Sequence, residues 1–228
     1  MKVSVIGGTG PQGLGIALRL AIEGVEVIVG SRKEEKALTV VDEAKEKYAD
    51  YDLSNMCGMS NEDAAKEGDV LILTVPLAAQ KPTVEGIKEF CTDKIVMDAT
   101  VPLETAIGGK PFRFVDLMEG SAAERTAKIL DGTGAKVICA FCNISNSHLS
   151  NIPEEIDCDC LIAGDDKESK EIAVEIINKI PGIRTIDTGI LEKARIIEKI
   201  TPLLIGLNIK YRSHYGGLRI TGIPKLDE

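Results

Sequence analysis

Apolar residues along the chain follow two alternating patterns. Short runs that are apolar at nearly every position, such as residues 2–7 (KVSVIG) and 70–76 (VLILTVP), are typical of strands buried on both faces. Longer segments in which apolar residues recur every three or four positions, such as residues 11–24 with Gly24 as a stop, are typical of helices. The pattern predicts strands at 2–7, 25–30, 55–59, 70–76, 94–100 and 135–141, and helices at 11–24, 33–49, 61–68, 77–90 and 121–132.

This alternation of strands and helices predicts the α/β class, with a parallel sheet that is doubly wound because its crossovers are right-handed. The rhythm changes after residue 145. A polar loop at 143–157 is followed by a strand at 158–164, a helix at 166–180, a short strand within 181–189, and a long helix at 191–213 that Pro202 is expected to kink. We therefore expect one domain over residues 1–145, with a smaller C-terminal α/β portion over 146–228 packed on its sheet.

A glycine-rich stretch, GGTGPQGLG, stands between the first strand and the first helix. Gly8, Gly10 and Gly13 form the G-x-G-x-x-G pattern of dinucleotide-binding, Rossmann-type domains, in which the pyrophosphate lies on the N-terminus of the helix. Gly8 permits the tight turn, Gly10 admits the pyrophosphate, and Gly13 lets the helix pack on the strand. The residues expected to contact the nucleotide here are Gly8, Thr9, Gly10, Pro11, Gln12 and Gly13. The alternative is a tight turn without a ligand.

The end of the second strand carries no acid. In an NAD-binding unit an Asp or Glu at this place binds the ribose 2′-hydroxyl, but here the chain has Gly30, Ser31, Arg32 and, one helical turn later, Lys36. A hydroxyl, a guanidinium and an ammonium suit the 2′-phosphate of NADP. We therefore expect NADP as the cofactor, the alternative being an ordinary solvated helix start.

Further contacts are expected where later strands end, because the carboxyl edge of a parallel sheet lines the ligand crevice. Thr74, Val75 and Pro76 end the fourth strand and Val101 follows the fifth, so all four are expected to contact the cofactor, with Thr74 and Pro76 facing the nicotinamide ribose. Any of them could instead be a simple strand terminus.

The overall charge restricts the partners of the protein. With 27 basic and 36 acidic residues among 228, the formal net charge is -9, so neither nucleic acid nor an anionic membrane is expected as a partner. No apolar run approaches the ~20 residues of a membrane span, and no signal peptide is recognised, so a cytoplasmic location is expected. The six cysteines are scattered through apolar segments; buried structural thiols are favoured over a metal or redox site, and no metal is predicted.

Several motifs taken together resemble one enzyme family across nearly the whole chain. In order, they are GGTGPQGLGIALRLA, GSRKEEKA, NEDAAKEGDVLILTVP, GSAAERTAKIL, GDDKESK and ITPLLIGLN. They are similar to the NADPH-dependent coenzyme F420 reductases, or F420:NADP oxidoreductases, of methanogens, other archaea and actinobacteria. The resemblance implies a homodimeric enzyme that transfers a hydride between C5 of the deazaflavin and C4 of the nicotinamide, with an NADP domain and a C-terminal part that helps form the deazaflavin pocket.

The same resemblance implies site residues. NADP contacts carry over to Thr9, Gln12, Ser31, Arg32, Lys36 and Thr74. The deazaflavin pocket is expected to involve Cys142, Asn143, Ile144 and Leu207. Asn143 and Ile144 fit the family pattern after the sixth strand, whereas Cys142 and Ser145 depart from it.

Other functions remain open from the sequence. Both partners of the expected reaction are hydride carriers, so no general base is predicted, and His148 and His214 are expected at the surface. An NADP-dependent reductase of another small acceptor would need a positioned acid, and Lys199 and Lys210 lack the Lys-x-x-x-Asn arrangement of hydroxyacid dehydrogenases. A non-catalytic NADP-binding sensor is the third possibility.

Two features of the C-terminal region also allow two interpretations. Lys210, Arg212 and Arg219 could receive the anionic groups of a polyanionic deazaflavin tail, or could form a solvated basic end. The last helix carries an apolar stripe that suits an internal core better than a dimer interface. The stripe comprises Ile196, Ile197, Ile200, Leu203, Leu204 and Leu207.

Overall fold

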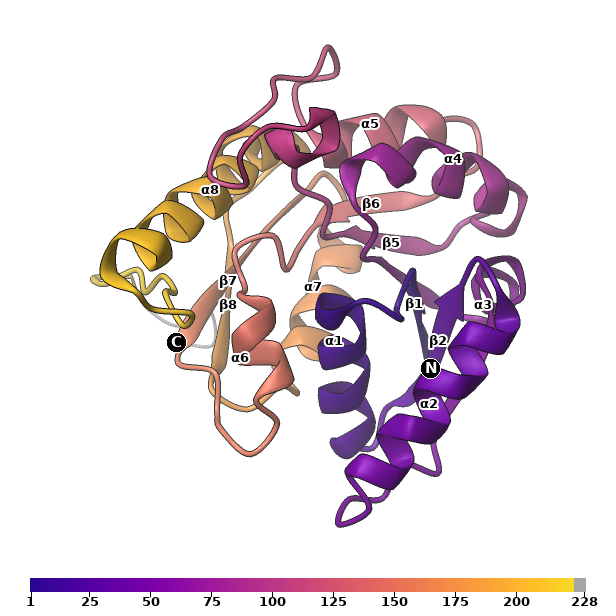
Figure 1. Cartoon of the computed structure of the whole chain (residues 1–228). Coiled ribbons are helices and arrows are strands. Elements are labelled where there is room, and N and C mark those ends of the chain that lie inside the picture. Colours follow the sequence, from indigo (N-terminus) through magenta and orange to yellow (C-terminus); the bar gives the residue numbers. More distant parts are fainter. Residues whose placement is uncertain (224–228) are drawn as a thin grey trace.

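The buried apolar runs form the strands of one sheet. The computed structural model describes residues 1–223, and within them eight strands lie in the order β3-β2-β1-β4-β5-β6-β7-β8 (Figure 1). The strands are β1 (Lys2–Ile6), β2 (Glu26–Ser31), β3 (Met56–Ser60), β4 (Val70–Leu73), β5 (Ile95–Asp98), β6 (Lys136–Cys139), β7 (Cys158–Gly164) and β8 (Ile183–Asp187).

Helices connect these strands and cover both faces of the sheet. They are α1 (Pro11–Ile22), α2 (Glu34–Lys47), α3 (Asn61–Glu67), α4 (Leu77–Ile87), α5 (Ala122–Ile129), α6 (Asn146–Ser150), α7 (Lys167–Ile177) and α8 (Ala194–Tyr211), with single 3-10 turns η1 (Lys88–Phe90), η2 (Glu104–Ile107) and η3 (Leu191–Lys193). The expected α/β class with a doubly wound sheet is confirmed.

Two apolar cores lie on the two faces, because successive side chains of a strand point to opposite sides. Val3 and Val5 of β1 pack with α1 and α7 in one core, whereas Ile6 packs with α3 and α4 in the other. Complete burial of strands on both sides explains their nearly continuous apolar sequences.

The C-terminal strands extend this sheet. Strands β1 to β6 pair in parallel, β6 then pairs antiparallel with β7 through Ile138 opposite Gly164 and Cys139 opposite Ala163, and β7 pairs in parallel with β8. The expectation that residues after 145 pack on the sheet was therefore wrong for these strands, which add to its edge. Helix α8 then returns across the carboxyl ends of the strands (Figure 1).

Two local elements differ from the sequence-based expectation. The polar segment at 143–157 contains helix α6, which begins after Ser145, whose hydroxyl accepts a hydrogen bond from the Ser147 N–H at 3.2 Å. Helix α8 continues as one element through the buried Pro202. In the part of the chain that the structure describes, no helix combines the length and the apolar character needed to span a bilayer.

Candidate functional site

A cavity of about 1560 Å³ runs along the carboxyl edge of the sheet. Its lining extends from the end of β2, past the ends of β1, β4, β5 and β6, to α6 and α8. In Figure 1, β2 and α8 lie on opposite sides of the molecule. The described residues that line it include Arg32, Lys33, Lys36 and Arg212 and no Asp or Glu. The cavity is therefore a local region of positive charge in a chain of net charge -9.

The glycine loop forms the wall of the cavity between β1 and α1. A Cβ atom on Gly8 would lie 2.7 Å from the Val5 carbonyl oxygen, and one on Gly13 would lie 2.5 Å from the Thr74 Oγ1 atom. A Cβ atom on Gly10 would meet nothing within 4 Å, and Gly10 lines the cavity. Gly8 and Gly13 therefore allow close packing, whereas Gly10 keeps the space in front of the α1 N-terminus open.

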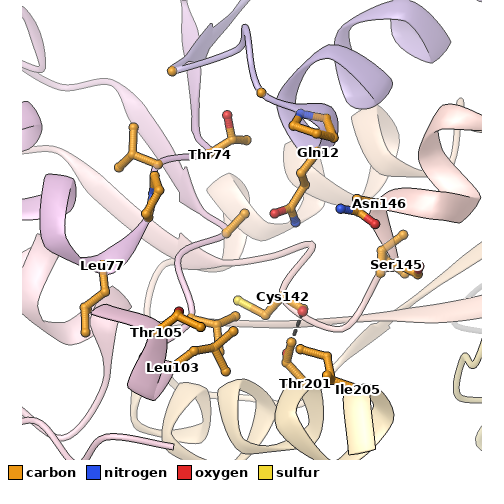
Figure 2. A pocket seen from close by; sticks show the side chains of 18 of the residues that line it. Gln12, Thr74, Leu77, Leu103, Thr105, Cys142, Ser145, Asn146, Thr201 and Ile205 are labelled. Carbon is orange, nitrogen blue, oxygen red and sulfur yellow. Dashed lines mark hydrogen bonds between the residues drawn. The ribbon is translucent and has the colours of Figure 1, made fainter. Parts of the chain in front are cut away.

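Other contacts fix the position of this loop. The Gly7 N–H donates to Asn61 Oδ1 at 3.0 Å, and the Gly8 N–H donates to the carbonyl of Gly30 at 2.9 Å. The Gln12 side chain lies in the cavity and donates to the Phe141 carbonyl at 3.1 Å (Figure 2). The first loop is thus joined to the end of β6, 129 residues further along the chain.

The end of β2 supplies the basic region of the cavity. Ser31 is the last residue of β2 and is buried, with 5% of its surface exposed, whereas Arg32 and Lys36 are exposed and all three line the cavity. Lys33, which the sequence analysis did not select, lines it as well. Within residues 1–223, Arg32, Lys33 and Lys36 form no ion pair, so these three side chains line the cavity without a carboxylate partner.

The middle of the cavity is formed by the residues that follow three adjacent strands. Thr74, Val75 and Pro76 follow β4, Val101 follows β5, and Cys142 follows β6 (Figure 2). The Thr74 hydroxyl donates to the Ile6 carbonyl at 3.1 Å, which fixes this side chain at the end of β1. All the predicted strand-end residues therefore meet in one place, as their positions at the carboxyl edge require.

Helix α8 closes the cavity from the other side. Thr201, Leu204, Ile205 and Asn208 line it, and the Thr201 hydroxyl donates to the Cys142 carbonyl at 2.6 Å (Figure 2). Leu207, which the sequence analysis expected in the deazaflavin pocket, lies outside this cavity. With 3.6 residues per turn, residues 201, 204, 205 and 208 share one face of the helix and residue 207 lies off it. Sequence analysis missed this inward face, although its helical spacing was visible.

Leu207 instead lines a separate hollow of about 370 Å³ on the outer side of α8. That hollow is formed by Phe112, Phe114, Pro202, Leu203, Gly206, Leu207 and Lys210. Two basic residues that were candidates for binding the deazaflavin tail also lie on different sides of α8. Lys210 lines the outer hollow, and Arg212 lines the main cavity.

The loop after β6 is held by its own polar groups. Asn143 is 2% exposed, and its side chain donates to the Asp159 carbonyl at 2.6 Å and accepts from the Leu161 N–H at 3.1 Å. Asn143 borders the cavity, and its amide binds β7 through one donated and one accepted hydrogen bond. Ile144, which is 4% exposed, contributes an apolar side chain to the lining.

Cys142 lines the cavity as a neutral thiol. Its sulfur lies 3.5 Å from that of Cys139, and the hydrogen bond between them, together with burial, holds the pKa of Cys142 well above the usual range. Burial raises the pKa of Cys158 to about 11. Across residues 1–223 no group of three or more His, Cys, Asp or Glu side chains is arranged to hold a metal ion.

Buried carboxyl groups lie behind the cavity wall. Asp98 at the end of β5 accepts from Gln80 Nε2 and Thr126 Oγ1, each at 2.7 Å, and burial raises the pKa of its carboxyl. Glu198 of α8 is fully buried and accepts the N–H groups of Ala122 and Ala123 at 2.9 and 3.1 Å; burial raises its pKa to about 8. Neither residue lines the cavity; both stabilise the packing of the elements behind its wall.

A buried arginine fixes the α6 side of the cavity. Arg19 of α1 is 3% exposed, and its guanidinium donates to the carbonyls of His148, Leu149, Asn151 and Glu154 at 2.7 to 3.0 Å. Gly15 permits this approach, because a Cβ atom there would lie 2.7 Å from the Leu149 Cβ. The segment that carries Ser145, Asn146 and Ser147 into the cavity is thereby attached to α1.

The two histidines occupy different places. His214 lines the cavity, whereas His148 lies outside it and its Nε2 atom donates to the Tyr215 carbonyl at 2.7 Å. Arg219 does not reach the cavity, because its guanidinium pairs with Asp157 and Asp159.

Comparison with known proteins agrees with this arrangement. Residues 2–102 match the family model described as NADP oxidoreductase, coenzyme F420-dependent. The chain is 51% identical over 225 residues to the F420-dependent NADP reductase of Methanothermobacter marburgensis, covering 99% of this chain and 100% of that protein. It is 46% identical over 224 residues to the F420-dependent NADP reductase of Methanocaldococcus jannaschii, covering 98% and 99%.

Solved structures show the same fold at lower identity. A structure from Arthrobacter sp. FB24, provisionally named an F420-dependent NADP reductase, has a TM-score of 0.82 at 21% identity and covers 97% of this chain and 100% of its own. A pyrroline-5-carboxylate reductase from Coxiella burnetii has a TM-score of 0.59 at 19% identity, with 92% and 67% covered. The resemblance in sequence motifs is confirmed by the full-length relatives: the chain belongs to the family of F420-dependent NADP reductases.

Proposed function

We propose that this protein is an oxidoreductase that transfers a hydride between NADP(H) and coenzyme F420. The observation that carries the proposal is one continuous cavity with Arg32, Lys33 and Lys36 at one end, Arg212 at the other, and no carboxylate in its described lining. Its volume of about 1560 Å³ exceeds the ~300–1,000 Å³ of an ordinary ligand pocket, as a site for two large anionic cofactors requires.

The NADP portion occupies the end formed by β1, β2 and α1. The pyrophosphate lies at the glycine loop with Thr9, Gly10, Pro11 and Gln12, where the α1 N-terminus and the open side of Gly10 fit a phosphate group. The 2′-phosphate lies among Ser31, Arg32, Lys33 and Lys36. The nicotinamide end lies beside Thr74, Val75, Pro76 and Val101.

The deazaflavin portion occupies the opposite end, between the loop after β6 and α8. Cys142 and Ile144 from the loop, with Thr201, Leu204 and Ile205 from α8, replace the expected contact from Leu207. The division at residue 145 belongs to the same proposal: residues 1–145 bind NADP and supply the loop after β6, and the portion 146–228, of which residues 224–228 lie outside the described part, completes the acceptor side.

The two cofactors supply the hydride chemistry, and the chain aligns them and excludes water. Val75, Val101 and Ile144 give this part of the cavity an apolar lining, and a hydride passed between two carriers needs no general acid or base. A reductase of a small carbonyl substrate would need such a group. Lys199, one candidate for it, pairs with Asp116 at 3.0 Å and does not line the cavity.

A spectrophotometric assay tests the proposal. The protein is mixed with NADPH and oxidised coenzyme F420, loss of the deazaflavin visible absorbance is followed, and NADH serves as the control. We expect turnover with NADPH and at most slow turnover with NADH. Tight NADPH binding without turnover of F420 would contradict the proposal and indicate another acceptor or a binding protein. A rate that depends on an acid group across pH 5 to 9 would favour the reductase of a small acceptor.

A homodimer and a cytoplasmic location complete the proposal. The outer side of α8 exposes Ile196, Leu203 and Leu207 at 62%, 60% and 41%, whereas Ile197 and Leu204 of the same stripe are buried. The exposed leucines border the hollow lined by Phe112 and Phe114, so a ridge and a groove lie side by side. A two-fold axis through such a surface would place each ridge in the partner's groove.

A further inference from the structure

The chain after α8 forms a strap that returns over β7. Helix α8 ends at Tyr211, and Arg212 turns the chain with a positive φ of 53°. We call residues 212–221 the strap. The Asp159 N–H donates to the Leu218 carbonyl at 2.7 Å, and a Cβ atom on Gly217 would lie 2.9 Å from the Cys158 Cβ, so the strap lies directly on the start of β7.

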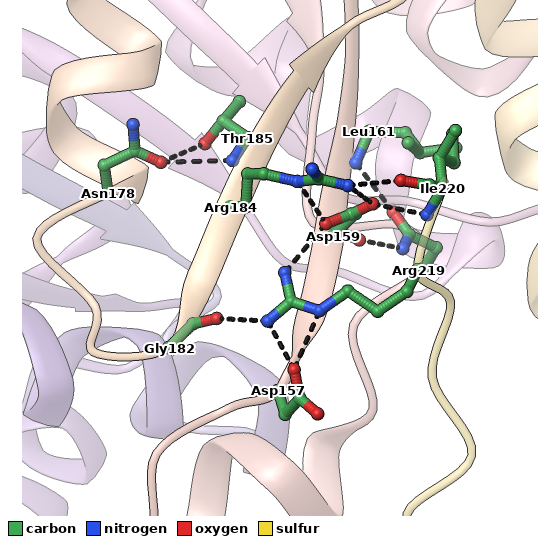
Figure 3. A network of polar contacts seen from close by, with 10 residues as sticks. Asp157, Asp159, Leu161, Asn178, Gly182, Arg184, Thr185, Arg219 and Ile220 are labelled. Atoms are coloured by element: carbon green, nitrogen blue, oxygen red, sulfur yellow. Dashed lines mark hydrogen bonds and ion pairs between the residues drawn. The ribbon is translucent and has the colours of Figure 1, made fainter. Parts of the chain in front are cut away.

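One buried carboxylate holds the strap. Asp159 is 0% exposed, and its carboxylate accepts from Arg184 at 2.9 and 2.7 Å, from Arg219 at 2.8 Å and from the Ile220 N–H at 2.6 Å (Figure 3). Arg219 also donates to the exposed Asp157 at 2.8 Å. Burial alone would raise the pKa of Asp159, but these hydrogen bonds outweigh it and lower the pKa to about 2. The carboxylate is therefore charged and saturated with donors.

The strap reaches the cavity at its other end. Arg212, Ser213, His214 and Gly216 line the cavity next to α6. The Ser145 hydroxyl donates to the His214 carbonyl at 3.0 Å, and the Gly216 N–H donates to Asn208 Oδ1 at 2.8 Å. The strap thus forms the far wall on the side that we assign to the acceptor, and Asp159 lies outside that wall.

We propose that Asp159 is a positioning residue for the acceptor: by anchoring the strap on β7, it holds Arg212 and His214 at the far end of the cavity. This inference rests on the proposed function. Asp159 is also on the strand whose backbone binds the Asn143 amide, so the strap and the loop after β6 are attached to the same short segment of β7. No hydrogen bond or ion pair within residues 1–223 joins the strap to the end of β2 or to the loop after β1, where we place NADP.

The inference predicts a selective change in acceptor binding. Asp159→Asn removes the charge that two arginines share, and Gly217→Ala pushes the strap away from Cys158 without removing a charge. Both variants should raise the KM for coenzyme F420 about tenfold, the factor to which ~1.4 kcal/mol corresponds. The KM for NADPH and the kcat at saturating F420 should stay near those of the unsubstituted protein.

Asp157→Asn is the matched control, because it removes the exposed partner of Arg219 and leaves the anchor on Asp159. It should leave both KM values unchanged. Hydrogen exchange of the strap amides should accelerate in Asp159→Asn and in Gly217→Ala, and not in the control. Gly217→Ala also decides the matter if Asp159→Asn does not fold.

The outcomes separate the two proposals. If the unsubstituted protein turns over F420 but Gly217→Ala leaves the KM for F420 unchanged, or raises the KM values for F420 and NADPH equally, the role of the strap is overturned. The proposed function then still stands. Absence of F420 turnover in the unsubstituted protein overturns the proposed function and this inference with it.

Discussion

Arg32 is the residue on which the proposed preference for NADP depends most directly. It stands where an NAD-binding unit carries an acid, lines the cavity beside Ser31, and has two further cations, Lys33 and Lys36, on the same wall. Short segments of the chain build this region, because the glycine loop and the end of β2 are each local in sequence. For that reason the sequence could predict it residue by residue, apart from Lys33.

Replacement of Arg32 by Asp should reverse the cofactor preference. A charge-assisted hydrogen bond is worth ~1.5–3 kcal/mol, so kcat/KM for NADPH should fall about 10- to 100-fold relative to NADH. Lys47→Asp, the same charge change at the exposed far end of α2, is the control and should leave the ratio unchanged. An unaltered ratio in Arg32→Asp would refute the assignment of the 2′-phosphate.

The glycines of the first loop should separate binding from stability. Gly10→Val places a side chain in the open cavity and should abolish NADPH binding with little change in melting temperature, because Gly10 has φ -85° and ψ 166°, which valine adopts readily. Gly13→Ala should instead lower stability by about 1–3 kcal/mol through its contact with Thr74. Calorimetric titration and thermal unfolding distinguish the two, and the reverse pattern would contradict the loop assignment.

At the scale of elements, the sequence predicted strands and helices wherever apolar residues recurred at a regular spacing. The predicted strands and helices of residues 1–141 are present, but α6 was not predicted, because its five residues are too short to show a helical repeat. The acceptor side was predictable only in part. Thr201 and Ile205 reach it because α8 crosses the edge of the sheet, and the Asn143 side chain is hydrogen-bonded to β7. Both contacts join segments that are distant in sequence, so no local pattern could predict them.

The link between α8 and α5 should make stability depend on pH. Glu198 has a usual pKa of 4.5 that burial raises to about 8, so between these values the folded state holds a proton that the unfolded state has released. The free energy of unfolding should therefore fall as pH rises from about 5 to 8, by up to ~1.4 kcal/mol per unit from this group. Glu198→Gln should lose that contribution.

Urea unfolding of both proteins at several pH values measures this effect. The stability of Glu198→Gln relative to the unsubstituted protein should increase steadily from pH 5 to 8, since only the latter carries the titrating carboxyl. A difference that is constant over this range would show that Glu198 titrates alike in the folded and unfolded states.

At the scale of the whole molecule, the outer side of α8 is the surface to test for assembly. Leu203→Glu should convert a dimer into a monomer, because it places a charge in the apolar interface between two copies. Leu38→Glu is the control, since Leu38 is 46% exposed on α2, away from α8. Light scattering after size exclusion should give twice the mass of one chain for the unsubstituted protein and for the control. A monomer in all three proteins would refute the dimer.

The antiparallel pairing of β6 with β7 has a mechanical consequence. Many enzymes that bind a nucleotide between two lobes close by a hinge rotation, but here β7 and β8, which carry the strap, belong to the same hydrogen-bonded sheet as β1 and β2. No hinge can open between them without breaking the sheet. Cofactors should therefore enter by local movement of loops, and small-angle scattering should give the same radius of gyration with and without saturating NADPH.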